Sequence, residues 1–242
     1  MALKPELRQN FTVDPEVLGD VAKALEIHTN DKIIEIGPGK GVLTLKILNT
    51  LKHAKTEENK VQSLVSFEVD EDLREDLESI KRRFNGIFDY RIQSFLDAKP
   101  KPGFNKCTGN IPYHISEPLL FKFIDWNFEE IVMITGIKFA RKVCGEIEGK
   151  IATISIYLFD SEILKEYDKN IFFPKSKVDS ALLKMKRKTE FKDDKEKLLS
   201  QIMSNTDKKH LWLNKLLGYD QGQTGQIYHM DLEKLVEDVR KH

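Results

Sequence analysis

The sequence predicts an α/β fold in which a doubly wound, mostly parallel sheet is followed by a small helical domain. Three observations support this class. Short apolar segments alternate with segments of helical periodicity over residues 14–188, a glycine-rich turn at 37–41 joins an apolar strand to a helix, and strand signals stop after Lys188. Strands that alternate with helices are typical of a parallel sheet built from βαβ units.

Each expected strand is a short apolar run, and each expected helix has apolar residues spaced near 3.6 positions apart. The first helix covers 14–25, and the first buried strand, 32–36, leads into the glycine turn and a helix over 42–51. After a polar loop insertion at 55–62, the remaining elements are a helix over 72–84 and strands at 61–69, 90–92, 106–109, 129–134, 151–159 and 181–185.

The last part of the chain is predicted to form a separate unit. The sequence after Lys188 is first polar and charged and then helical, without strand signals. Asp207 can cap a helix that ends at Gly218, and Asp231 can cap a final helix. We therefore expect a main domain over 1–189 and a small helical domain over 190–242.

The amino-acid composition limits which class of protein this chain can belong to. The 242 residues are 40% hydrophobic and 32% charged, which is typical of a soluble globular protein. No apolar run approaches the roughly 20 residues of a membrane span, and the first residues lack the pattern of a secretory signal. The two cysteines, Cys107 and Cys144, have no metal-type spacing and fit a reducing compartment. We expect a cytoplasmic monomer without a metal site.

The charge is balanced overall but locally uneven. The chain carries 39 basic and 39 acidic residues, so its formal net charge is zero, a mild argument against nucleic acid as a partner. Local basic clusters nevertheless occur at 81–83, 99–106, 184–188 and 208–210. Each cluster alone fits a solvated surface, whereas a site that handles RNA would give all of them a common purpose.

The glycine turn and an acid on the next strand point to an adenosine-containing ligand. Glu35 precedes the turn, and Gly37, Gly39 and Gly41 let a ligand approach the backbone at the start of a helix. Glu68 ends the following strand, where an acid accepts hydrogen bonds from ribose hydroxyls in doubly wound sheets. A nucleotide and a sulfonium cofactor both fit this pattern, and so does a turn that uses glycine only for steric reasons.

The segment after the fourth expected strand combines Asn110, Ile111, Pro112 and Tyr113. Methyl transfer to an exocyclic adenine amine needs acceptors for its two N–H groups, which the Asn110 side chain and the Ile111 carbonyl can provide. Pro112 fixes the chain, and Tyr113 offers a face on which a flipped base can stack, worth ~1–3 kcal/mol. The alternative is a buried turn with Tyr113 in the core.

These residues resemble the ribosomal RNA adenine N6-dimethyltransferases, which include housekeeping small-subunit enzymes and macrolide-resistance enzymes. The likeness covers residues 8–188 and consists of motifs in the family's order. They are the QNF of 9–11, the E-x-G-x-G-x-G turn of 35–41 with Thr44, the strand end at 67–70, the GNIPYHIS of 109–116, the FAR of 139–141 and the FFPKSKVDS of 172–180.

The resemblance implies a Rossmann-like methyltransferase fold that uses S-adenosylmethionine and acts on ribosomal RNA or a pre-ribosomal subunit. It implies that Asn110, Pro112, Tyr113 and Phe172 handle the target adenine, with Phe172 on its other face. It also implies a cofactor pocket formed by Gln9, Asn10, Thr12, Glu35, Gly37, Gly39, Gly41, Glu68, Ser94, Phe95 and Asn110. The basic run at 208–214 faintly resembles a C-terminal helix of the housekeeping branch, which implies that the small helical domain over 190–242 is RNA-contacting.

Three departures from the family pattern stand out. Ser94 replaces an Asp that holds the cofactor's adenine, a change expected to weaken cofactor binding by about 1–2 kcal/mol, and Asp97 could compensate. The stretch 135–138 lacks the usual acid, and Ser176 replaces a proline. The leading hypothesis is an rRNA adenine N6-methyltransferase. The alternative is a non-catalytic RNA-binding assembly or transcription factor on the same fold, and methylation of a small molecule or protein is disfavoured.

Overall fold

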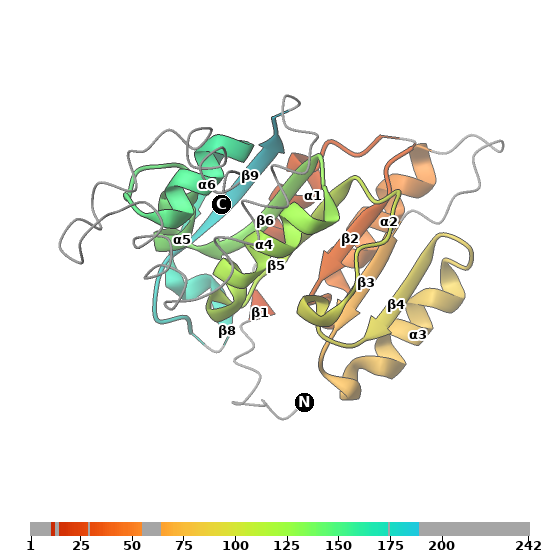
Figure 1. Ribbon diagram of the computed structural model, residues 1–242. Helices are drawn as coiled ribbons and strands as arrows, with labels where there is room; N and C mark the ends of the chain where they lie inside the picture. Colours follow the sequence, from red (N-terminus) through yellow and green to blue (C-terminus); the bar gives the residue numbers. More distant parts are fainter. Residues whose placement is uncertain (1–10, 13–14, 29, 55–63, 174, 189–242) are drawn as a thin grey trace.

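A seven-stranded sheet forms the centre of the fold (Figure 1). The computed structural model describes residues 11–12, 15–28, 30–54, 64–173 and 175–188. The strand order is β4-β3-β2-β5-β6-β9-β7, with all pairs from β4 to β6 parallel and β9 antiparallel to both neighbours. The strands are β2 (Ile33–Ile36), β3 (Leu64–Glu68), β4 (Phe88–Ile92), β5 (Lys106–Asn110), β6 (Glu130–Gly136), β7 (Phe159–Tyr167) and β9 (Ser180–Arg187). The prediction of a doubly wound, mostly parallel sheet is confirmed.

Helices cover both faces of this sheet. On one face the sheet packs against α1 (Pro15–Ala24), α2 (Val42–Ala54) and α3 (Arg74–Arg83). On the other face it packs against α4 (Ser116–Trp126), α5 (Ile137–Val143) and α6 (Lys150–Leu158). Neighbouring residues of β2 show the division, because Ile33 belongs to the first core and Ile34 to the second. Strands buried on both faces read as continuous apolar runs, which is why the sequence located them.

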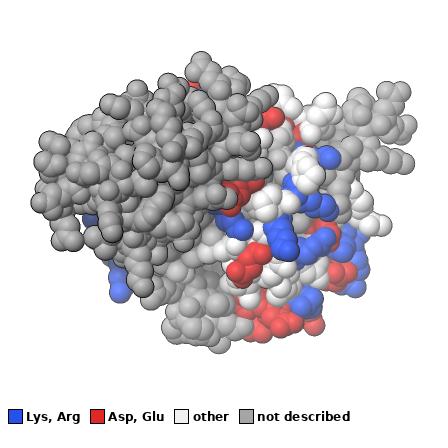
Figure 2. Space-filling model, viewed as in Figure 1, with Lys and Arg blue, Asp and Glu red and all other residues white. Residues whose placement is uncertain are grey.

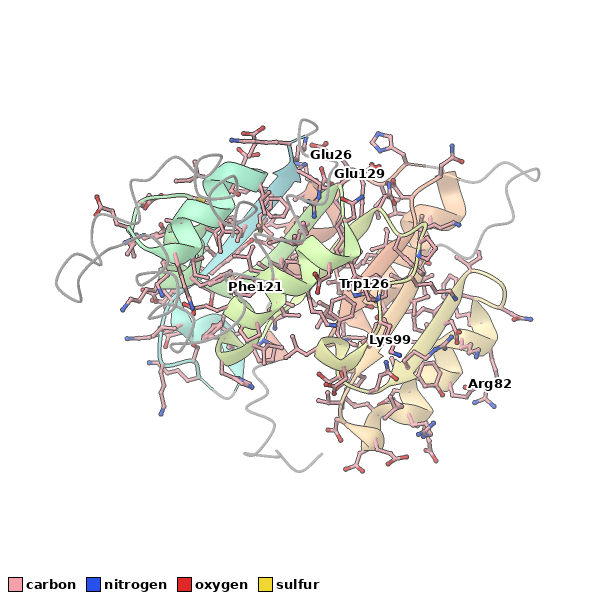
Figure 3. The ribbon with its side chains drawn as sticks, viewed as in Figure 1. Glu26, Arg82, Lys99, Phe121, Trp126 and Glu129 are labelled. Atoms are coloured by element: carbon pink, nitrogen blue, oxygen red, sulfur yellow. The ribbon has the colours of Figure 1, made fainter. Side chains whose placement is uncertain are left out.

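Short elements complete the described chain. Four 3₁₀ turns are η2 (Glu71–Leu73), η3 (Phe95–Asp97), η4 (Tyr113–Ile115) and η5 (Lys169–Ile171). A separate two-stranded sheet pairs β1 (Phe11–Thr12) antiparallel with β8 (Phe172–Phe173). An aromatic group fills the core under α4: Trp126, which lies between that helix and the sheet in Figure 3, stacks on Phe128 at 5.7 Å and packs against Phe95 at 5.0 Å.

The expected strand at 151–159 is wrong, because residues 150–158 form α6. The buried residues Ile151, Ile154, Ser155 and Leu158 follow the i, i+3, i+4, i+7 spacing of a helix, and Ile156 is 51% exposed on the opposite side. A short, nearly continuous apolar run fits a buried strand and a buried helix equally well. The strand of this region is β7, which follows directly and which the sequence prediction missed, as it missed α4 and α5.

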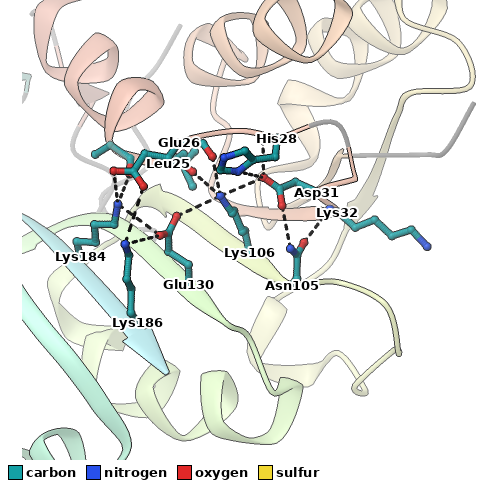
Figure 4. Close-up of polar contacts among 11 residues, drawn as sticks. Leu25, Glu26, His28, Asp31, Lys32, Asn105, Lys106, Glu130, Lys184 and Lys186 are labelled. Atoms are coloured by element: carbon teal, nitrogen blue, oxygen red, sulfur yellow. Dashed lines mark hydrogen bonds and ion pairs between the residues drawn. The ribbon is translucent and has the colours of Figure 1, made fainter. Parts of the chain in front are cut away.

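Buried ion pairs connect α1 to the N-terminal ends of the central strands (Figure 4). Lys106 Nζ lies 3.0 Å from Asp31 Oδ2 and 3.3 Å from Glu130 Oε1, and donates to the Leu25 carbonyl at 2.6 Å. Lys184 Nζ lies 3.4 Å from Glu130 Oε2 and donates to a second carbonyl at the end of α1. These lysines thereby satisfy carbonyls that a helix end leaves unpaired. Although burial alone would raise the pKa of Asp31, its hydrogen bonds and Lys106 lower it.

This network changes the interpretation of the basic clusters. Lys106 and Lys184, counted above in the clusters at 99–106 and 184–188, are buried and are not available to RNA. Over α3 and β4, blue and red side chains are interspersed in Figure 2. There Lys81 pairs with Asp89 at 2.9 Å and Arg74 pairs with Glu71 at 2.8 Å. Within these clusters, Lys81, Lys106 and Lys184 are therefore paired with acidic side chains of the described residues.

Several predictions concern residues outside the described ranges. They are the helices and loop of 190–242, the basic cluster at 208–210 and the polar insertion at 55–62. The division into domains at residue 189 stays a prediction. Within the described residues, no helix is long and apolar enough to cross a membrane.

Candidate active site

The glycine turn lies at the carboxyl end of β2, where the sheet changes its winding direction. The chain proceeds from β2 to β3 on one side and from β5 to β6 on the other, so a switch point falls between β2 and β5. Ligands of open α/β sheets bind outside the carboxyl ends of the strands at such a point. Both predicted motifs, the glycine turn and the segment from Asn110 to Tyr113, follow these two strands.

The turn needs glycine for conformation and for space. Gly37, Gly39 and Gly41 have φ values of 67°, 58° and 78°, in the left-handed region that favours glycine. A Cβ on Gly41 would also collide with Cδ1 of Ile80 on α3. A Cβ built on Gly37 would lie 3.8 Å from the backbone oxygen of Asn110, so the two motifs meet across the switch point.

Glu68 connects the glycine turn to the end of β3. Its Oε2 accepts a hydrogen bond from Gly39 N at 3.1 Å, and its Oε1 accepts from Val69 N at 2.8 Å and Asp70 N at 3.0 Å. Burial raises the pKa of this carboxyl even though the three N–H donors oppose the shift. Each carboxylate oxygen has two acceptor sites, so these bonds leave one on Oε2, on a side chain that is 4% exposed.

Glu35 lies beneath the turn and is fully buried. Its Oε2 accepts from Thr44 Oγ1 at 2.7 Å and from Ser66 Oγ at 2.6 Å, while no described atom bonds to Oε1. Burial raises the pKa of the carboxyl to about 7, against the opposing effect of the two hydroxyls. Because it has no exposed surface, Glu35 supports the turn from below, and its predicted direct contact with a cofactor is not available in this arrangement. Thr44 and Ser66 were not predicted as site residues, although Ser66 lies beside Glu35 in the parallel register of β2 and β3.

The second motif continues from the tip of β5. Gly109 is required there because a Cβ would collide with the carbonyl oxygen of Ile36 on β2. Asn110, the last residue of β5, is partly exposed. Ile111 N then donates to the Ile134 carbonyl at 2.9 Å, which holds the chain on β6, and Pro112 turns it into η4. The motif is therefore anchored to both neighbouring strands.

Tyr113 is held at its ring and at its hydroxyl. The hydroxyl lies 2.6 Å from Ser180 Oγ and 3.2 Å from Ser176 Oγ. A Cβ built on Gly136 would lie 3.3 Å from Cγ of the ring, so one side of the ring packs on the β6 backbone. Neither serine was predicted to contact Tyr113, and no local signal could have shown it, because Ser180 is 67 residues away.

Three predicted site residues have other contacts. Phe172 is 3% exposed and belongs to the α1-side core, so as placed its ring has almost no surface for a base. Phe95 is equally buried and packs edge-on against Phe67 at 5.1 Å. Ser94 caps η3 by accepting from Leu96 N at 3.2 Å. For Phe172 and Phe95, a ligand contact would require the side chain to move out of the core.

The N-terminal motif is only partly described. Gln9 and Asn10 lie outside the described residues. The backbone of Thr12 in β1 pairs with that of Phe172 in β8. This pairing brings the end of the QNF segment beside the FFPKSKVDS segment, although the two are far apart in sequence. Among the described residues there is no group of three or more His, Cys, Asp or Glu side chains that could hold a metal ion.

A mostly parallel sheet with a glycine turn, a strand-end acid and an Asn-Ile-Pro-Tyr segment at its switch point defines a Rossmann-like methyltransferase domain. Residues 1–206 match the family described as ribosomal RNA adenine dimethylase. The chain belongs to this family, and the predicted class of rRNA adenine methyltransferase is thereby confirmed at the level of the family.

Individual relatives agree with this assignment. Ribosomal RNA small subunit methyltransferase A of Mycoplasmopsis synoviae (strain 53) is 32% identical over 207 residues, which cover 81% of this chain and 73% of the relative. The protein of the same name from Thermotoga maritima is 30% identical over 190 residues, 77% of this chain and 64% of the relative.

Two solved structures show the same fold at 21% identity. The 23S rRNA methyltransferase ErmE has a TM-score of 0.63, with 96% of this chain and 100% of that chain covered. A dimethyladenosine transferase from Plasmodium falciparum has the same score, with 96% and 88% covered.

Proposed function

We propose that this chain transfers methyl groups from S-adenosylmethionine to the N6 amine of adenine in ribosomal RNA of the small subunit. The observation that carries the proposal is the meeting of the glycine turn and the Asn110 segment across the switch point between β2 and β5. This arrangement supports a cofactor pocket that lies beside a base-handling motif. The names of the relatives support the small subunit as the source of the RNA.

The described residues fit the proposed cofactor. The turn presents backbone without side chains at its three glycines, and Glu68 keeps one acceptor site on Oε2 for a ribose hydroxyl. Ser94 can offer its hydroxyl to the adenine, while Gln9, Asn10 and Thr12 stay predicted contacts. When bound, this cofactor supplies an electrophilic methyl group on a sulfonium, which carries no phosphate.

The segment after β5 would prepare the acceptor amine. The Asn110 side-chain oxygen and the Ile111 carbonyl accept the two N–H groups, which aims the nitrogen lone pair at the methyl group. Stacking on Tyr113 offsets much of the few kcal/mol that flipping a base costs. The amine held by these two acceptors would take up the methyl group as the sulfonium releases it, and the resulting cationic amine would lose its proton to water. No strong general base is needed.

Partner and compartment follow from this activity. The substrate would be ribosomal RNA or a pre-ribosomal subunit, met in the cytoplasm by a protein that acts as a monomer. The Phe172 ring, predicted to lie on the second face of the base, would have to leave the α1-side core to do so. We therefore assign the stacking to Tyr113, and a contact of Phe172 with the base stays a prediction.

A non-catalytic RNA-binding factor on the same fold is the second candidate. It is favoured by Ser94, an uncharged residue where the family has an acid, whose hydroxyl already caps η3. Calorimetry with S-adenosylmethionine separates the two, because a protein without detectable cofactor binding cannot carry out the transfer. Binding with a Kd at or below the millimolar range is expected for the enzyme.

Activity is tested with labelled S-adenosylmethionine and separated small and large ribosomal subunits, followed by mapping of the labelled base. We expect label at an adenine of the small subunit and a loss of about 100-fold or more in Asn110→Ala, because the amine loses an acceptor and its orientation. Asn85→Ala, at an exposed turn after α3, is the matched control and keeps full activity. Wild-type activity in Asn110→Ala would overturn the mechanism, and label in neither subunit would favour the binding factor.

A further inference from the structure

Tyr113 is seated by three residues that the proposed chemistry does not itself use. Ser180 and Ser176 meet its hydroxyl at 2.6 and 3.2 Å, and Gly136 supports one side of its ring. Both serines are buried, at 0% and 4% exposure. A tyrosine that only filled space would not need two buried hydroxyls at its polar end, since an unpaired hydroxyl there costs free energy and a phenylalanine would avoid it.

The seat, by which we mean Gly136, Ser176 and Ser180, is itself held by strand pairing and hydrogen bonds. Gly136 and Ser180 are direct partners in the antiparallel pair of β6 and β9, so one residue of this cross-strand pair supports the ring and the other holds the hydroxyl. Ser176 is fixed by its own loop, because its Oγ donates to the Val178 carbonyl at 2.7 Å and accepts from Val178 N at 3.2 Å. The position of Tyr113 is therefore determined by the sheet and by the FFPKSKVDS segment together.

Two of the three seat residues coincide with departures from the family pattern. Gly136 lies in the stretch 135–138, and Ser176 stands where a proline is usual. A side chain at 136 would press on the ring within 3.3–3.6 Å, and a proline at 176 would supply no hydroxyl. These two departures from the family pattern therefore both lie next to the Tyr113 side chain.

We infer that Gly136, Ser176 and Ser180 are positioning residues that set the location of the Tyr113 ring, and through it the plane of the target base relative to Asn110. This inference rests on the proposed function. With one side of the ring against β6, the base has the other side for stacking. A displacement of the ring would therefore move the amine away from the acceptors at Asn110 and Ile111.

Single-turnover methylation of small ribosomal subunits tests this role. Tyr113→Phe keeps the stacking ring and removes the tethered hydroxyl. We expect the methylation rate of this variant to fall about tenfold, because the ring should move by well under the ~1 Å that costs about 100-fold in rate. The methylation rate of the double variant Ser176→Ala, Ser180→Ala should fall by the same factor. Adding Tyr113→Phe to this double variant should lower the rate no further, because all three substitutions remove the same tether. The affinity for S-adenosylmethionine should be unchanged. Tyr90→Phe is the matched control, since its hydroxyl donates to Glu78 at 2.9 Å outside the site.

A measurement on the protein alone separates this inference from the proposed function. With ¹³C-labelled tyrosine, the Cζ chemical shift reports the hydrogen bonds of the hydroxyl, and the shifts of the other ring carbons report the surroundings of the two faces. We expect both to change in the double serine variant for Tyr113 only, because the ring loses its hydroxyl partners and moves relative to β6. Unchanged Tyr113 signals in that variant would overturn the inference, as would additive rate losses or a wild-type rate in Tyr113→Phe. If the wild type methylates neither subunit, the proposed function fails, and the NMR result alone decides whether the serines seat the ring.

Discussion

Glu35 gives the protein a stability that should depend on pH in a defined direction. Its pKa of about 7 in the folded state exceeds the ordinary value of 4.5, so the folded protein binds the proton more tightly than the unfolded chain. The stabilising contribution of the protonated form is complete below pH 4.5 and is lost as the pH rises through 7. One pKa unit corresponds to 1.36 kcal/mol, so the full loss is about 3 kcal/mol.

The perturbation is Glu35→Gln, which keeps an oxygen for Thr44 and Ser66 and cannot ionise. Urea unfolding at pH 5, 6, 7 and 8 gives the free energy of unfolding of both proteins. The stability of the variant relative to wild type should increase by about 2–3 kcal/mol between pH 5 and pH 8. Any constant cost of the unpaired amide cancels in this comparison. The exposed Glu71→Gln is the matched control and should show no such trend.

A flat difference between Glu35→Gln and wild type across this range would refute the reasoning. It would mean that the carboxylate is as well solvated in the folded protein as in the unfolded chain. The orphaned Oε1 would then have to be hydrated, since no described side chain or backbone group reaches it.

Three further predictions concern packing and charge, each measured by urea unfolding. Lys106→Met breaks a buried ion pair and should destabilise by about 3–5 kcal/mol, whereas Lys186→Met, whose side chain is 54% exposed, should cost less than about 1 kcal/mol. Gly41→Ala should cost about 1–3 kcal/mol, and Ile80→Val should recover part of that in the double variant, because it deletes the colliding Cδ1; equal cost in both backgrounds would contradict the clash. Phe172→Ala should cost about 3–5 kcal/mol through the cavity it leaves, and an unchanged stability would contradict the core position of that ring.

The sequence predicted the parallel half of the fold well because its strands are buried on both faces. The run at 33–36, apolar except for Glu35 and bounded by the glycine turn, is typical of such a strand. The segment 150–158 was misassigned because its apolar residues also fit a strand, and only packing of the buried Ile151 and Leu158 against the sheet settles the choice. Local apolarity alone does not determine which period the chain adopts.

The candidate site was predictable where its residues lie within one motif, as for Asn110 and Tyr113. What the sequence could not show are contacts between distant segments: the bond of Tyr113 to Ser180, or the burial of Phe172 in the α1-side core. Such contacts depend on how β9 returns antiparallel beside β6, which no local pattern encodes. The supporting residues of the site were therefore found only in the structure.

Strand β5 begins at Lys106, in the ion-pair network, and ends at Asn110, in the proposed site. Changes at its first residue alter how much of the protein is folded, whereas changes at its last alter how fast each folded molecule works. The residue that affects stability and the residue that affects the rate thus lie at opposite ends of one five-residue strand, too far apart to share contacts. An engineer, or natural selection, could raise the melting temperature of this protein through Lys106 and its partners without retuning catalysis.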